Sequence, residues 1–192
     1  MIFLISIRFL WINLPILLSV LPIIGCLICI GARQHAIGIL GHDGAHRLIC
    51  RNKFLNDALS ACLCFWPLGL PLGGYRKFHF EHHRKVGTKE DPELVHKNNF
   101  FLGQWNLPFR WPIVMLHLVG DFCGGAIPHL IMAARLTKAT SFLDQLGVFV
   151  MIGFLFFSGW YFGFLWAVGI WFLCLWTTFW ATFRIRIWTE HV

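Results

Sequence analysis

The chain has 192 residues, enough for one domain, and its composition is 57% hydrophobic but only 13% charged. Soluble domains carry about 25% charged residues, so this composition excludes an ordinary soluble protein. The apolar residues form blocks with almost no charge, which is typical of segments that lie in lipid. The net charge is +7, and the basic residues flank these blocks. Because no nucleic-acid-binding motif is present, we expect a membrane surface, and no nucleic acid, as the anionic partner.

The first apolar block covers residues 9–31 and contains no charged residue. Its length predicts one helix that crosses the bilayer, since about 20 residues are needed. Pro15 and Pro22 are expected to kink this helix. The remnant of two spans, the first of them cut short, is the alternative interpretation.

The middle of the chain is interrupted by helix breakers and charge. Residues 54–74 are apolar but contain five prolines and glycines after position 66, which favours a helix followed by a re-entrant or interfacial turn. Residues 76–98 are polar, basic and rich in histidine. Residues 104–138 mix apolar and charged residues, which predicts amphipathic helices in the membrane interface.

The last apolar block covers residues 146–183, which are 38 residues without a charge. It predicts two spanning helices of about 18 residues each, with a turn near Ser158–Gly163. Gly159 and Gly163 indicate either a close helix contact or simply the turn itself.

The distribution of charge predicts the topology. Fifteen of the sixteen Lys and Arg residues, all but Arg8, lie in the segments around the histidines, and the Ser158–Gly163 turn has none. Because basic loops stay on the inner side, we expect the histidine segments in the cytoplasm. The predicted fold is an all-α integral-membrane domain over residues 1–192, with three to four transmembrane helices, interfacial helices and a cytoplasmic histidine-rich cap.

Six of the ten histidines lie in three short motifs that this topology brings to one membrane face. His42 and His46 are four residues apart, so a helix projects them from one side. Because His79 precedes the next two histidines by three and four residues, that group can also converge. Imidazole is a good ligand for iron, zinc and copper. The candidate metal ligands are His42, His46, His79, His82, His83 and His191.

The sequences HDGAH, HFEHHRKVGTKEDPEL and RIRIWTEH resemble the histidine boxes of the membrane fatty acid desaturase–hydroxylase family, especially its bacterial members. The resemblance implies a helical membrane fold and two iron ions in a non-haem di-iron centre held almost wholly by histidine. It also implies O2-dependent attack on a C–H bond of a membrane lipid or acyl substrate. The implied electron donor is a ferredoxin, a rubredoxin or a cytochrome b5-type protein.

The same resemblance assigns the boxes. His42 and His46 match the first box, and the group that begins at His79 matches the second. His191 matches the opening histidine of the third box, which continues with further histidines in the family. Because the chain ends at Val192, we expect it to be truncated and the C-terminal part of the domain to be missing.

Several residues beside the motifs are candidates for supporting roles. His35 lies seven residues before His42, on nearly the same helical face, and could be a further ligand or a hydrogen-bond partner. Carboxylates next to a ligand can fix the orientation of an imidazole, although they can equally be ordinary cytoplasmic side chains. These carboxylates are Asp43, Glu81 and Glu190. The histidines without box spacing, expected at the surface or in the membrane interface, are His96, His117 and His129.

Other functions remain open. A hydroxylase or ketolase of the same superfamily, acting on an alkane, sterol or carotenoid, would use the same boxes, because the outcome depends on how the substrate is placed. A zinc-binding membrane protein or hydrolase is less compatible with five clustered histidines and the absence of HExxH. An inactive membrane fragment is the remaining alternative.

Overall fold

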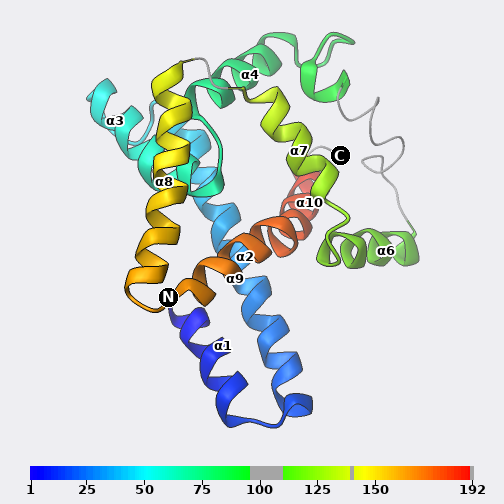
Figure 1. Ribbon diagram of the computed structural model, residues 1–192. Helices are drawn as coiled ribbons and strands as arrows, with labels where there is room; N and C mark the ends of the chain where they lie inside the picture. Colours follow the sequence, from blue (N-terminus) through cyan, green and yellow to red (C-terminus); the bar gives the residue numbers. More distant parts are fainter. Residues whose placement is uncertain (96–109, 139–140, 191–192) are drawn as a thin grey trace.

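The computed structural model describes residues 1–95, 110–138 and 141–190, and the regular secondary structure in these ranges is helical (Figure 1). Three helices are long and apolar enough to cross a membrane: Ile16–Ala45, Phe142–Tyr161 and Leu165–Thr189. Two further helix pairs, each bent at a short break, raise the number to as many as five if each pair is one span. The predicted all-α membrane fold is therefore confirmed.

The N-terminal apolar block folds differently from the prediction of one span over residues 9–31. Helix α1 (Ile2–Asn13) ends before Pro15, and helix α2 (Ile16–Ala45) begins after it. Leu14 is extended because proline restricts the residue before it, and α1 turns back to pack along α2 (Figure 1). Pro22 lies inside α2 without ending it. The span is therefore displaced toward the C-terminus and runs directly into the first histidine motif.

The segment that was predicted as a helix and a turn is confirmed as such. Helix α3 (Lys53–Leu59) continues into the π-helix η1 (Ser60–Phe65) and then into the 3-10 helix η2 (Trp66–Leu68). Gly69 follows with φ +77°. Helix α4 (Leu72–Lys85) follows at an angle of 93°. This bend turns the second histidine motif across the end of α2.

The N-terminus of α4 is capped by a residue from a distant helix. Asp144 of α8 (Phe142–Tyr161) accepts hydrogen bonds from the backbone N–H groups of Leu72, at 3.1 Å, and Gly73, at 2.7 Å. A carboxylate is favourable at this position because the first N–H groups of a helix lack internal partners and the helix dipole is positive there. The cap therefore fixes α4 to a helix that is long enough to span the membrane.

The C-terminal half contains α6 (Trp111–Phe122), α7 (Ile127–Leu136), α9 (Leu165–Trp176) and α10 (Thr178–Glu190). The turn between α8 and α9 lies at the predicted place, with φ +73° at Gly163. Gly159 serves the close contact instead, because a Cβ there would lie 2.8 Å from the Val168 side chain. The interfacial location of α6 and α7 stays a prediction.

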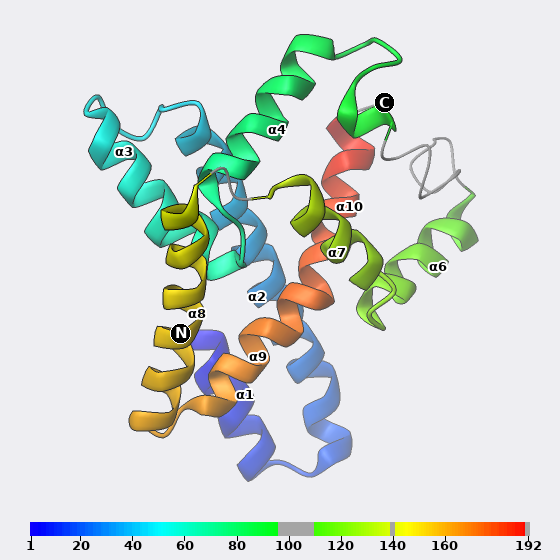
Figure 2. The same cartoon turned by 45° about the horizontal axis from the view of Figure 1, so that its top comes forward.

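The outer faces of the long helices expose large apolar side chains. Leu17 and Leu21 of α2 are 86% and 78% exposed, and Phe154 of α8 is 61% exposed. Contiguous apolar exposure of this kind fits contact with lipid rather than with water. Helices α3, α4 and α7 gather at the end of the molecule opposite the α1–α2 turn (Figures 1 and 2).

Candidate metal centre

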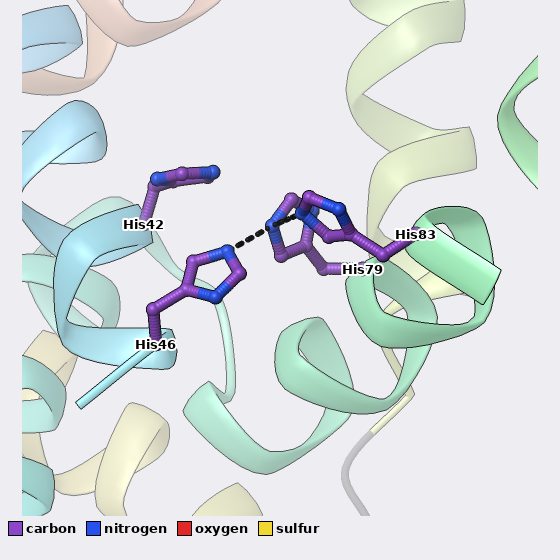
Figure 3. A group of neighbouring side chains, drawn as sticks. All are labelled: His42, His46, His79 and His83. Carbon is purple, nitrogen blue, oxygen red and sulfur yellow. Dashed lines mark hydrogen bonds between the residues drawn. The ribbon is translucent and has the colours of Figure 1, made fainter. Parts of the chain in front are cut away.

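Two helices bring four histidines together at the C-terminal end of α2 (Figure 3). His42 lies in the last turn of α2 and His46 is its C-terminal cap residue, while His79 and His83 lie on α4. Each pair is spaced four residues apart, so each helix presents two rings from one side. One ligand atom from each histidine lies within 4.8 Å of the others.

Hydrogen bonds alone do not satisfy these ring nitrogens, because two of them approach the same nitrogen of His79. His79 Nε2 lies 2.8 Å from Nε2 of His46 and 3.0 Å from Nε2 of His83. A neutral imidazole nitrogen has either a proton or a lone pair, so His79 Nε2 forms one good hydrogen bond at most. A shared cation would instead allow every lone pair to point at one centre. Nitrogens on opposite sides of an ion with bonds of about 2.1 Å would lie about 4.2 Å apart, so small ring rotations would allow the four nitrogens to bind one ion.

The environment favours the neutral form of two of these imidazoles, His46 and His79. Burial, together with the surrounding imidazoles, lowers the pKa of His79 to about 3. Burial and the neighbouring His42 and His83 rings also lower the pKa of His46. A neutral ring offers the lone pair that a metal requires. The residues present therefore fit a transition-metal ion, and nitrogen ligands suit iron as well as zinc, copper and nickel.

Polar contacts that involve no histidine hold the two helices in this arrangement. Arg76 of α4 donates to the terminal carbonyl groups of α2, at 2.9 Å for Ala45 and 3.2 Å for Gly44. The same guanidinium forms a bidentate pair with Asp57 of α3, at 2.6 and 3.0 Å. The hydrogen bond with Arg76 lowers the pKa of Asp57 despite partial burial. Arg76 thus satisfies the C-terminus of one histidine helix from the other.

A cavity of about 460 Å³ opens beside the histidines, between α2, α4, α7 and α10. His42, His79 and His83 form part of its wall, and most of the remaining wall is aromatic or aliphatic. The aromatic lining residues are Phe65, Tyr75, Phe78, Phe179, Trp180 and Phe183. A mostly apolar pocket with a few convergent polar groups is the usual form of a small-molecule site.

The structure separates the other predicted site residues. His82 lies on α4 beside the cluster but outside the group of four, and its Nδ1 is 2.8 Å from Asp91. His35 is buried in the cavity wall, edge-on to the rings of Phe179 and Phe183.

The structure also places the predicted supporting carboxylates in different surroundings. Asp43 is half exposed and lies 3.4 Å from Nδ1 of His42. Glu81 contacts Arg84 and Lys85 on its own helix, rather than an imidazole, among the contacts of the described residues. The side chain of Glu190 and all of His191 lie outside the described residues. The metal-site roles of all these residues stay predictions.

Two residues were not predicted at the site. Asp91 follows the second motif, and the Asp-Pro pair nine residues after His82 is its one visible signal in the sequence. His129 lacks box spacing, yet it lines the cavity and stacks on Trp180, with ring centroids 5.7 Å apart. Only the tertiary fold brings it there.

Comparison with known proteins identifies the family. The family model described as fatty acid desaturase matches residues 18–192. The chain belongs to the fatty acid desaturase family. The chain is 30% identical over 96 residues to Delta(5) fatty acid desaturase fat-4 of Caenorhabditis elegans. The matched segment covers 44% of this chain and 22% of the nematode protein, so the chain spans about a fifth of that relative. No solved structure matches significantly.

Proposed function

We propose that the protein removes hydrogen from a fatty acyl chain, as a lipid or a thioester, in an O2-dependent desaturation at a di-iron centre. The observation that supports this most strongly is the group of four histidines beside an apolar cavity, three of which form part of its wall. Family membership supports the same oxidoreductase chemistry and the use of iron. When bound, iron supplies the activation of O2 that an unreactive C–H bond requires.

Some residues of this chain would hold the metal, and others would position the substrate. One ion would be held by His42, His46, His79 and His83, and His82 and His191 would contribute to a second ion. The aromatic wall of the cavity would exclude water and hold an extended acyl chain against the histidines. The outcome of the reaction depends on placing the acyl chain to within about an ångström, since misplacement by this amount greatly lowers the rate.

The test uses the full-length protein in a bacterial host, with iron analysis of the purified protein and mass spectrometry of the host lipids. We expect iron rather than zinc, and a product two hydrogens lighter than its substrate. His46→Ala and His79→Ala should abolish iron loading and turnover. His117→Gln is the matched control, because His117 lies on α6 outside the cluster and outside the cavity wall. A product that gains an oxygen atom would instead identify a hydroxylase, and bound zinc without iron would refute the proposal.

We further propose that the histidine motifs face the cytoplasm, where a ferredoxin, a rubredoxin or a cytochrome b5-type donor supplies electrons. Exposed basic residues near the motifs support this, since Arg47 and Arg84 are 46% and 73% exposed. An acidic donor would be attracted to such a surface, and turnover should fall as salt rises. Labelling of Lys89→Cys, at an exposed position, by an impermeant thiol reagent tests the side. Labelling of intact cells from outside would refute the cytoplasmic orientation.

A further inference from the structure

His82 lies in the cavity wall next to the clustered histidines, but its ring is held apart from them. Its centroid is 6.2 Å from that of His79 and 5.8 Å from that of His83. The side chain is only 14% exposed, so solvent does not set its orientation. A neighbouring group must therefore hold the ring.

Asp91 is that neighbour. One of its carboxylate oxygens, Oδ1, lies 2.8 Å from Nδ1 of His82, and the residue is 4% exposed. A carboxylate can only accept, so Nδ1 of His82 must carry the proton. In the neutral ring the lone pair is then on Nε2. The contact with Asp91 therefore selects the ring nitrogen that is available to a metal.

The carboxylate of Asp91 is itself fixed before any ligand binds. Its Oδ1 also accepts from the backbone N–H of Glu93 at 2.9 Å, and its carbonyl accepts from that of Val95 at 2.9 Å. Pro92 follows directly, where its ring favours the start of the helical turn. These backbone hydrogen bonds thus hold the Asp91 side chain in place.

The other ring nitrogen lies near a second carboxylate of the cavity wall. His82 Nε2 lies 3.5 Å from the Glu93 carboxylate, and both residues line the cavity. The contact between Asp43 and His42 is weaker than that between Asp91 and His82, because the separation is 3.4 Å and the side chain of Asp43 is 48% exposed. A buried, short, charge-assisted hydrogen bond orients a ring more firmly than an exposed and longer one.

We propose that Asp91 is a positioning residue that fixes the tautomer and orientation of His82 so that Nε2 can bind a metal ion. This inference rests on the proposed metal-dependent function and adds a residue to it. Partners of this kind typically change metal affinity 10- to 100-fold when they are removed. In this proposal Asp91 acts through His82 and not directly on substrate or metal.

The experiment is a titration of the metal-free full-length protein in detergent with Fe²⁺, and with Co²⁺ as a spectroscopic probe through its visible absorption. Asp91→Ser keeps a side chain that can cap the turn, because serine is as good an N-cap as aspartate, but it is too short to reach His82. Glu90→Ser is the matched control. Glu90 is adjacent, 78% exposed and paired only with Lys85 among the described ion pairs, so its replacement removes the same charge.

We expect Asp91→Ser to weaken metal binding 10- to 100-fold and to change the Co²⁺ absorption, while Tm and the Glu90→Ser titration stay at the wild-type values. The effect should vanish in a His82→Ala background, because the two changes remove one interaction. If Asp91→Ser does not fold, Asp91→Asn, which removes only the charge, should show a smaller weakening. Wild-type affinity and absorption in the Asp91 variants would overturn the inference alone. Absence of any metal binding by the wild type would overturn the proposed function as well.

Discussion

Gly31 lies where α2 crosses α10, and the crossing leaves no room for a side chain. A Cβ at this position would lie 2.3 Å from Oγ1 of Thr178 and 2.6 Å from the backbone nitrogen of Phe179. Thr178 Oγ1 also donates to the carbonyl of Leu27 at 2.9 Å, so the side chain cannot simply rotate away without losing a bond. Small residues permit such close approach of helices in membranes. Replacement of Gly31 must therefore move the backbone of α10.

The expected cost of Gly31→Ala follows from that displacement. Ordinary contacts to a Cβ begin near 3.4 Å, so the helices must separate by about 1 Å, and overpacking of this kind costs about 1–3 kcal/mol. For a chain of this length the loss lowers Tm by roughly 2–12 °C. Because α10 supplies Phe179 and Phe183 to the cavity wall, the variant should also bind or convert its substrate less well.

Gly25→Ala is the matched control, since Gly25 lies on the same helix and a Cβ added there would meet nothing within 4 Å. Alanine there should be neutral or stabilising by up to about 1 kcal/mol, because glycine is the poorer helix former. The assay is thermal unfolding in detergent, followed by size-exclusion chromatography of the heated samples. Equal Tm values for the two variants would refute the close crossing of α2 and α10.

Three further predictions concern polar contacts between distant segments. Asp144→Ala should lower the free energy of unfolding by about 0.5–2 kcal/mol, because α4 loses its cap. Hydrogen exchange should then rise at Leu72 and the residues after it. Unchanged exchange would contradict the cap. Arg184→Met should cost about 3–5 kcal/mol and lower Tm by roughly 6–20 °C, because it leaves the Asp121 carboxylate buried without the bidentate partner at 2.6 and 3.0 Å; a Tm within about 2 °C of wild type would argue against this pair. The pKa of Asp57 is lowered from 3.8, chiefly by the hydrogen bond with Arg76, so the stability it contributes is present above about pH 4 and is lost as the pH falls through the folded-state value. The Tm difference between wild type and Asp57→Asn should accordingly shrink on acidification below about pH 4, and a constant difference would exclude the ion pair as its source.

Local periodicity predicted the two histidine pairs, because a spacing of four residues fixes a shared helical face whatever the tertiary structure. His82 shows where that reasoning stops. At about 100° per residue, His82 and His83 lie on either side of the direction of His79, so helix geometry permits both to join one group. In the structure His82 instead contacts Asp91, which lies in a loop nine residues after it. No pattern within α4 contains that information.

The two prolines of the first apolar block illustrate the same limit. Pro15 divides the block into α1 and α2, whereas Pro22 is accommodated within α2. Each removes one backbone donor, so the local cost is similar. The difference is tertiary, since the residues before Pro15 fold back to pack on α2, while those around Pro22 would lose a continuous span if the helix ended there. Composition thus predicted the membrane class correctly but not the boundaries of the first span.

The histidine cluster is assembled by contacts that do not need a metal, and this predicts how the protein responds to metal removal. Arg76 ties the start of α4 to the last carbonyl groups of α2, at 2.9 and 3.2 Å, and Asp144 caps α4 from α8. Chelation should therefore lower the free energy of unfolding only by the contribution of ion binding, RT ln(1 + [L]/Kd). This contribution is about 2.7 kcal/mol when the ion concentration is about 100 times Kd. Circular dichroism and hydrogen exchange over residues 72–85 should show that α4 stays helical. Loss of protection throughout α4 on chelation would mean that the ion, rather than Arg76 and Asp144, holds the second histidine motif in place.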